Sequence, residues 1–258
     1  MDAAPHVVGR VAAVLRGLAQ SPQEGSTTSE VARLAGLPRP TTHRLLNSLA
    51  DAGFADREQR SGRWFLGPEL YLLGATAAGR YDVTEQARPH VHRLAAETGE
   101  SAFFSARRGD ETVCMLREDG SFPIRSFVLY EGARFPLGVV SAGLAVLSFL
   151  DDQDVDDYLG RVDLTADWGE PHSESALRQR IADTRHLGYA VNPGLVVEGS
   201  WGMAAAVFDH LGQPAWALTI TGVESRFRAE RRPALGQLLL DEAHRVTLTL
   251  QNSPARAR

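Results

Sequence analysis

Hydrogen-bond donors are concentrated in one short stretch near the N-terminus. Residues 27–54 read as a helix, a glycine turn and a second helix, and the second helix opens on Arg39 and Thr41. A helix fits the major groove of DNA, where donors near its start reach base edges, while hydroxyls and amides at helix ends bind phosphates. The chemistry indicated is binding to double-stranded DNA. The candidate contact residues are Thr28, Ser29, Arg39, Thr41, Thr42, His43, Arg44, Asn47, Arg60 and Arg63.

A second group of polar residues lies in the C-terminal half of the chain. Thr219 and Thr221 are two residues apart on a predicted strand, so both hydroxyls face one side of a sheet. Ser141, Ala142 and Gly143 begin a predicted helix, where free amides and the helix dipole favour a carboxylate. These two segments predict a site for a small organic acid.

Other kinds of chemistry find little support in the sequence. There is no HExxH motif, no glycine-rich nucleotide loop followed by lysine, and no GxSxG elbow around a serine nucleophile. His90 and His92 diverge by about 200° on a predicted helix, which argues against a metal pair. Cys114 lies in an apolar run typical of a buried structural thiol rather than a redox sensor. We therefore expect no metal, no cofactor and no enzymatic activity.

Charge is distributed unevenly along the 258 residues. The net charge is −5, but residues 1–80 carry 9 basic and 7 acidic side chains, whereas the remainder carries 18 and 25. Contact with DNA is therefore expected from the N-terminal part. No apolar run approaches the roughly 18 to 20 residues that span a bilayer, and the start lacks the pattern of a signal peptide. These features predict a cytoplasmic protein without a membrane partner.

The elements that would position the donors form a winged helix-turn-helix. Thr27 and Glu30 match a capping box at the start of one helix, Gly36 ends it, and the next helix closes at Gly53. Short strands over 55–57 and 63–66 form the wing, where arginines reach the DNA backbone or a minor groove. The expected domains are a DNA-binding domain over residues 1–67, a linker helix over 68–80 and an effector-binding domain over 81–258.

The C-terminal domain mixes both kinds of secondary structure. Periodicity predicts a sheet with helices packed on it, in the α+β class. Strands are expected over residues 101–107, 111–116, 124–129, 202–208 and 215–222, and helices over residues 83–95, 142–150, 173–187 and 235–246.

The chain resembles the isocitrate lyase regulator (IclR) family of bacterial transcription factors over nearly its whole length. The matching text includes TSEVARLAGLPRPTTHRLLNSLADAGF, the wing RSGRWFLGPELYLLG, RFPLGVVSAGLAVLSFL and LGYAVNPGLVVEGSWGMAAAVFDHLGQPAWALTITG. The resemblance implies a winged helix-turn-helix, a linker helix and a GAF-like or PAS-like effector domain. It also implies a homodimer or a dimer of dimers on a near-palindromic operator. Two alternatives from other classes remain, a metabolite hydrolase with an accessory DNA-like module and a protein-interaction adaptor.

The resemblance also implies effector contacts from Asn192 and Gly202. The family often carries an acidic residue at Asn192, a cysteine at Gly202, a histidine at Gly138 and a lysine at Leu144. These departures remove polar groups, whereas Phe135, Val140, Trp201 and Met203 add apolar and aromatic wall. The resulting hypothesis is a larger, apolar or aromatic acid stacked on Trp201, with ordinary core packing as the alternative role of Trp201. Glu198 is an alternative contact for an amine or hydroxyl group.

Overall fold

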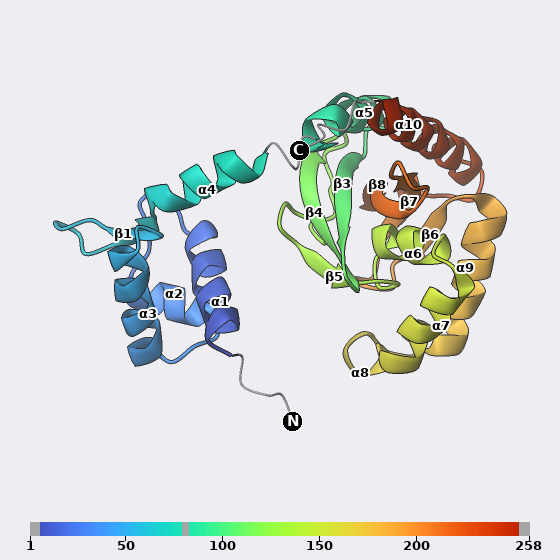
Figure 1. Ribbon diagram of the computed structural model, residues 1–258. Helices are drawn as coiled ribbons and strands as arrows, with labels where there is room; N and C mark the ends of the chain where they lie inside the picture. The colour runs from blue at the N-terminus through green and yellow to red at the C-terminus, as the bar shows by residue number, and fades with distance from the viewer. Residues whose placement is uncertain (1–5, 79–82, 253–258) are drawn as a thin grey trace. The chain divides into compact units, whose positions relative to one another are not determined.

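The chain forms two compact units in the computed structural model, which describes residues 6–78 and 83–252 (Figure 1). The division falls between Tyr81 and Asp82. The predicted end of the linker helix near Gly79 and the predicted start of the effector domain at Tyr81 lie outside the described residues.

The first unit is three helices followed by a two-stranded wing and a further helix. Its elements are α1 (Val7–Ala19), α2 (Thr28–Ala35), α3 (Arg39–Asp51), β1 (Ala55–Arg57), β2 (Trp64–Leu66) and α4 (Pro68–Ala78). β1 and β2 pair antiparallel, and an isolated bridge joins Ser26 to Trp64. The core beneath them consists of Val14, Leu18, Val31, Leu46, Leu49, Ala55 and Trp64. The prediction of a winged helix-turn-helix is therefore confirmed.

Glycine is required at one turn of this unit because an aromatic ring crosses the backbone there. Gly25 has φ +77°, and a Cβ at this position would lie 2.5 Å from the ring of Phe65. The glycine lets the segment before α2 pack directly on the wing, so the two parts keep a fixed distance.

The second unit is built on one six-stranded sheet in which all pairs are antiparallel. Its strands, in the spatial order β5-β4-β3-β8-β7-β6, are β5 (Arg134–Pro136), β4 (Glu111–Glu118), β3 (Ser101–Arg108), β8 (Pro214–Val223), β7 (Ser200–Phe208) and β6 (Ala190–Pro193).

Helices cover both faces of this sheet (Figure 1). α5 (Val83–Thr98) and α10 (Arg232–Asn252) pack on one face against Met203, Ala205 and Ile220. α6 (Ser141–Ser148), α7 (Asp152–Arg161) and α9 (Glu174–Leu187) form the core on the other face with Ala204 and Ala206. Between α7 and α9 lies the short α8 (Thr165–Trp168). The alternation of strand residues between two cores fixes which side chains of β7 face α6.

One predicted strand is wrong. Residues 124–129 form no strand, and the side chain of Phe127 is 75% exposed. The partner of β4 is instead β5, through Thr112 and Phe135. An apolar segment becomes a strand only where it can pair with a free edge of a sheet. Here β5 already pairs with the outer edge of β4. The sequence analysis also missed β5, which is three residues long, and β6 and α8, which are four residues long each. No helix of the described ranges is long and apolar enough to cross a membrane.

Candidate DNA-binding helix and effector cavity

The second helix of the helix-turn-helix presents a polar outer face. α3 buries Leu46 and Leu49, whereas Arg39, His43 and Arg44 are exposed. Thr41 and Asn47 are partly exposed on the same helix. These residues lie where sequence reasoning placed the DNA contacts, and their donors face solvent.

Two hydrogen bonds hold polar side chains of this face in place. Arg39 Nε donates to Ser29 Oγ across the helix-turn-helix at 3.2 Å. Asn47 Nδ2 lies 3.2 Å from His43 Nδ1, one turn along α3. These contacts restrain flexible side chains before any partner binds, which reduces the entropy lost on binding.

Thr42 does not belong to the polar face, and its prediction as a DNA contact is wrong. Its side chain is fully buried, and its hydroxyl donates to Pro38 O at 3.2 Å. A helix turns about 100° per residue, so three consecutive residues point in three different directions. Of Thr41, Thr42 and His43, it is Thr42 that points into the core. Thr42 therefore helps to close the first turn of α3.

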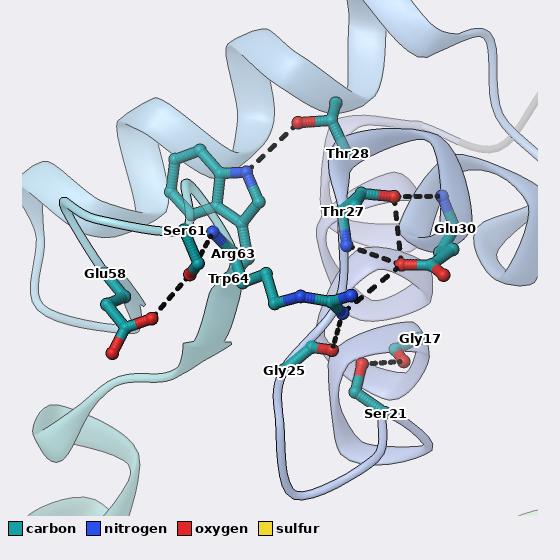
Figure 2. A network of polar contacts seen from close by, with 10 residues as sticks. All are labelled: Gly17, Ser21, Gly25, Thr27, Thr28, Glu30, Glu58, Ser61, Arg63 and Trp64. Atoms are coloured by element: carbon teal, nitrogen blue, oxygen red, sulfur yellow. Dashed lines mark hydrogen bonds and ion pairs between the residues drawn. The ribbon is translucent and has the colours of Figure 1, made fainter.

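Two further predicted DNA contacts, Arg63 and Thr28, take part in a network of polar contacts between α2 and the wing (Figure 2). Arg63 Nη1 donates to Gly25 O at 2.7 Å and lies 3.9 Å from Glu30 Oε2. Trp64 Nε1 donates to Thr28 Oγ1 at 3.1 Å. The guanidinium of Arg63 thus points towards the start of α2, and this contradicts its predicted role in the wing. Ser29 and Arg60 stay exposed.

The predicted capping box positions α2 within this network. Glu30 N donates to Thr27 Oγ1 at 3.3 Å, and Thr27 N donates to Glu30 Oε2 at 2.7 Å (Figure 2). The hydrogen bond from the Thr27 amide, followed by that from its hydroxyl, lowers the pKa of Glu30. The carboxylate therefore stays charged at the helix N-terminus, where the dipole favours it.

The second unit contains a small cavity beside the N-terminus of α6. Its volume is about 20 Å³, which is room for about one water molecule. The residues that line it are Val128, Leu129, Val140, Ser141, Asn192, Val196, Ser200, Trp201, Gly202 and Thr221. Six of the predicted effector contacts meet here, and no charged side chain lines the cavity.

Three neighbouring strands bring the polar residues of the cavity together. Gly202 of β7 pairs with Asn192 of β6 and with Thr221 of β8. A Cβ at Gly202 would lie 2.9 Å from Ser141 Oγ, so the glycine allows α6 to approach the sheet. The amide of Asn192 is occupied, since Nδ2 donates to Val139 O at 2.8 Å and Oδ1 accepts from Leu195 N at 3.0 Å.

Two groups of donors at or near this cavity have no acceptor among the described residues. The buried hydroxyl of Thr221 borders the cavity, and that of Thr219, on the same strand, is buried outside its wall. The first hydrogen bond of α6 runs from Leu144 N to Val140 O, which leaves three earlier amides without a helical acceptor. Buried polar groups without partners are costly, so an acceptor placed here would be bound favourably.

The other predicted effector contacts lie elsewhere. Met203 is buried in the core under α5 and α10, so the expectation that it lines the cavity is wrong. Trp201 borders the cavity, but its ring packs with the same core and lies 5.5 Å from the guanidinium carbon of Arg232. Phe135 packs on Trp168, with ring centroids 5.7 Å apart. Ala142 and Gly143 are buried within α6 beside the cavity without bordering it.

Sequence reasoning missed four residues of the cavity wall. Val128 and Leu129 come from the segment predicted to be a strand, Val196 comes from the turn after β6, and Ser200 is the first residue of β7. The only local signal for the second pair was the glycine pattern around Gly194 and Gly199, both with positive φ. Positions of loop residues relative to a sheet depend on tertiary contacts, which local patterns do not encode.

The single thiol and the paired histidines have structural surroundings. Burial raises the pKa of Cys114 to about 12, so the thiol is protonated at neutral pH. His90 Nδ1 lies 2.6 Å from Glu242 Oε2, which joins α5 to α10. Within residues 6–78 and 83–252 no group of three or more histidine, cysteine, aspartate or glutamate side chains is placed to hold a metal ion.

Family models match nearly the whole chain. The model described as IclR helix-turn-helix domain matches residues 7–59, and the one described as bacterial transcriptional regulator IclR C-terminal matches residues 75–248. The HTH-type transcriptional regulator KipR of Bacillus subtilis is 28% identical over 222 residues, covering 86% of this chain and 88% of the relative. The transcriptional repressor IclR of Escherichia coli is 27% identical over 247 residues, covering 93% and 90%.

Solved structures share the fold. The crystal structure of an IclR transcriptional regulator from Alicyclobacillus acidocaldarius superposes with a TM-score of 0.75 at 25% identity, covering 95% of this chain and 99% of that one. An IclR homologue from Microbacterium hydrocarbonoxydans, crystallised with 4-hydroxybenzoate, also has a TM-score of 0.75, at 22% identity and the same coverage. Helices, strands and their order are thus shared along both units.

Proposed function

This chain belongs to the IclR family of bacterial transcriptional regulators, and we propose that a small organic acid bound beside α6 controls its attachment to a near-palindromic operator. The protein is a DNA-binding regulator and not an enzyme. The proposal divides the chain into a DNA-binding domain (1–67), a linker helix (68–80) and an effector domain (81–258).

The exposed polar face of α3 carries the DNA-binding part of the proposal. Arg39, Thr41, His43, Arg44 and Asn47 read base edges in the major groove, where a bidentate arginine–guanine pair contributes about 1–3 kcal/mol of discrimination. Phosphates are contacted from both sides of this helix. The residues proposed for these phosphate contacts are Thr28, Ser29 and Arg60.

Selection from a random duplex library with the full-length protein tests this role. The expected result is a near-palindromic sequence whose half-sites are separated by about one helical turn, roughly 34 Å. Affinity should fall steeply as salt rises, because bound phosphates release counterions. No preferred sequence at low ionic strength, with or without metabolite extract, would contradict the proposal.

The unpartnered donors at the cavity beside α6 support a carboxylate ligand. Thr221 offers a hydroxyl at the cavity wall, and the first amides of α6 offer N–H groups near the positive end of the helix dipole. The apolar wall of Val128, Val140 and Val196 favours an acid with an apolar body. The related fold crystallised with 4-hydroxybenzoate is consistent with an aromatic acid, and Trp201, which borders the cavity, is the aromatic side chain that such an acid would meet.

This cavity has to widen before it holds such an acid. Its volume is far below the roughly 300–1,000 Å³ of typical ligand sites. Val128 and Val196 belong to the two irregular segments on its rim, which are free of helix and strand pairing.

Thermal-shift measurements with 4-hydroxybenzoate, benzoate and short aliphatic acids test the ligand class, since a true ligand raises the melting temperature as its concentration passes Kd. A response to short aliphatic acids alone would exclude an aromatic effector.

Exposed apolar side chains on two helices of the first unit support a homodimer or a dimer of dimers. On α4, Tyr71, Leu72 and Leu73 are 78%, 56% and 51% exposed, and on α1, Val7 and Val8 are exposed as well. Exposed apolar side chains on neighbouring positions of a helix, as at 71–73, are typical of a protein interface. Pairing also supplies a second recognition helix, which a small helix-turn-helix needs for useful selectivity. Sedimentation of the full-length protein, with Leu72→Glu as the disrupting variant, measures the assembly.

A further inference from the structure

A second, larger cavity lies at the edge of the sheet in the effector unit. Its volume is about 450 Å³, and it is bordered by Arg180, Asp183 and His186 of α9, by Val191 of β6 and by Arg232 of α10. β6 is the outermost strand on this side. Val191 packs with the core under α5 and α10, whereas the cavity beside α6 lies on the opposite face. The two cavities share no lining residue.

Arg180 carries a positive charge that no described residue neutralises. Its Nε and Nη1 are buried without a hydrogen-bond partner, and its Nη2 donates only to the carbonyl of Gly138 at 3.1 Å. Among the described residues it forms no ion pair, unlike Arg178 and Arg185 on the same helix. Burial lowers the pKa of Arg180 to about 10, so the side chain remains charged at neutral pH. A buried, unpaired guanidinium is unfavourable until an anion accompanies it.

Arg232 brings a second unpaired guanidinium to the same cavity. Its Nε is buried without a partner, and its guanidinium lies over the ring of Trp201 instead of an acid. Because Trp201 contacts one face of the guanidinium, its edge donors remain free of the ring. The partly exposed side chain also stands at the first residue of α10, where the helix dipole favours negative charge.

The acidic group on the cavity wall does not neutralise these two charges. Asp183 accepts a hydrogen bond from Gln179 Nε2 at 2.9 Å and forms no ion pair with a described residue. Its arginines and its aspartate give the wall two positive charges and one negative charge. The cavity is therefore net positive, and its excess charge matches one oxyanion.

We propose that the cavity between α9, β6 and the start of α10 binds a small anionic metabolite through the oxyanion of a phosphate or carboxylate group. Arg232 contributes the free donors of its guanidinium at the start of α10. Arg180 then turns its planar fork from the Gly138 carbonyl to the anion, in the bidentate arrangement that guanidinium groups favour. This site is separate from the proposed effector cavity and does not depend on it.

Titration of the full-length protein with inorganic phosphate and with malonate tests the proposal, with sodium chloride at equal ionic strength as the reference. We expect saturable binding and a raised melting temperature with at least one of the two anions. Binding by phosphate alone or by malonate alone identifies which oxyanion the site prefers. A response no larger than that to chloride would overturn the proposal.

Matched variants show where the anion binds. Arg180→Gln and Arg232→Gln should each weaken binding about tenfold or more, since each removes a charge-assisted pair. Arg178→Gln, on the same helix but ion-paired to Asp156, should bind as the wild type does. Thr221→Val should also leave anion binding unchanged, since it borders the other cavity. Wild-type affinity in both Arg180→Gln and Arg232→Gln would place the anion elsewhere and refute the site.

The melting temperature in anion-free buffer distinguishes anion binding by Arg180 from a purely structural role. Arg180 has a single hydrogen bond and an unpaired buried charge, so Arg180→Gln should melt at the same temperature as the wild type or higher in anion-free buffer. The anion that binds the wild type, phosphate or malonate, should then raise the melting temperature of the wild type only. A lower melting temperature of the variant, together with unchanged anion binding, would show that Arg180 serves the fold alone.

Discussion

Arg44 is the side chain whose replacement tests the DNA-binding face most directly. It is exposed on α3 and forms no ion pair with a described residue, so its loss disturbs no contact of the fold. Arg44→Gln should weaken operator binding by about 1–3 kcal/mol, because a base-edge or phosphate contact is lost. Fluorescence anisotropy at several salt concentrations measures the change and also shows whether the salt dependence becomes shallower. Arg178→Gln in the effector unit is the control, and an equal loss in both variants would contradict the assignment.

Thr221 offers a test of the same kind at the effector cavity. Its buried hydroxyl has no partner, so Thr221→Val removes an unsatisfied group at nearly constant shape. The ligand-free variant should be as stable as the wild type or gain up to about 1–3 kcal/mol in urea unfolding. The acid identified by thermal shift should stabilise the variant less than the wild type. Destabilisation of the ligand-free variant would show instead that the hydroxyl has a partner in the folded protein.

α2 depends on its capping box, which makes the first unit sensitive to acid. The pKa of Glu30 is lowered in the folded state, so its contribution to stability is full above the unfolded pKa of about 4.5 and is lost as the pH falls through the lower folded pKa. Thr27→Ala removes the hydroxyl of the pair and should destabilise this unit by about 1 kcal/mol at neutral pH. In this variant, part of the dependence of the free energy of unfolding on acidic pH should disappear. Urea unfolding at neutral and acidic pH, followed by circular dichroism and with Ser48→Ala as an exposed control, measures both effects.

Local patterns predicted the elements that rest on neighbouring residues. The capping box of Thr27 and Glu30 and the left-handed Gly36 arise from contacts within a few positions, and the structure confirms both. The prediction of a strand over residues 124–129 is wrong because β4 pairs with β5, a segment several residues further along the chain. Its apolar residues instead serve the rim of a cavity or remain exposed. Patterns of apolar residues thus locate strands less reliably than the short-range signals that cap helices.

The prediction for Met203 is wrong because it ignored the alternation of a strand. Consecutive residues of a strand point to opposite faces, so Gly202 and Met203 cannot both face α6. Gly202 faces α6 and Met203 lies in the core under α5 and α10, whereas Trp201 packs with that core and also borders the cavity. The same rule correctly placed Thr219 and Thr221 on one face. Only three-dimensional packing could add Val128 and Val196, because both come from irregular segments.

At the scale of the whole molecule, we propose that the effector acts through an equilibrium between two arrangements of a dimer. A ligand shifts this equilibrium only by the difference between its affinities for the two states, and a change from 1:99 to 99:1 requires a difference of about 5.5 kcal/mol. In the proposed mechanism the linker helix α4 transmits the change, so the spacing of the two recognition helices differs between the states. Opening of the rim around Val128 and Val196 on ligand binding would supply the differential contacts.

Distances between the two wings of the dimer test this mechanism. Gln59 is exposed in the wing and was not assigned a DNA contact, so Gln59→Cys provides a position for a spin label. The single native thiol, Cys114, is buried and has a pKa raised to about 12, so it should not react and no further substitution is needed. Pulsed electron resonance should show that the distance distribution shifts when the saturating acid is added. Thr221→Val, which binds the acid more weakly, should shift less at the same concentration. Identical distributions with and without acid, at a concentration that releases DNA, would rule out control through the spacing of the recognition helices.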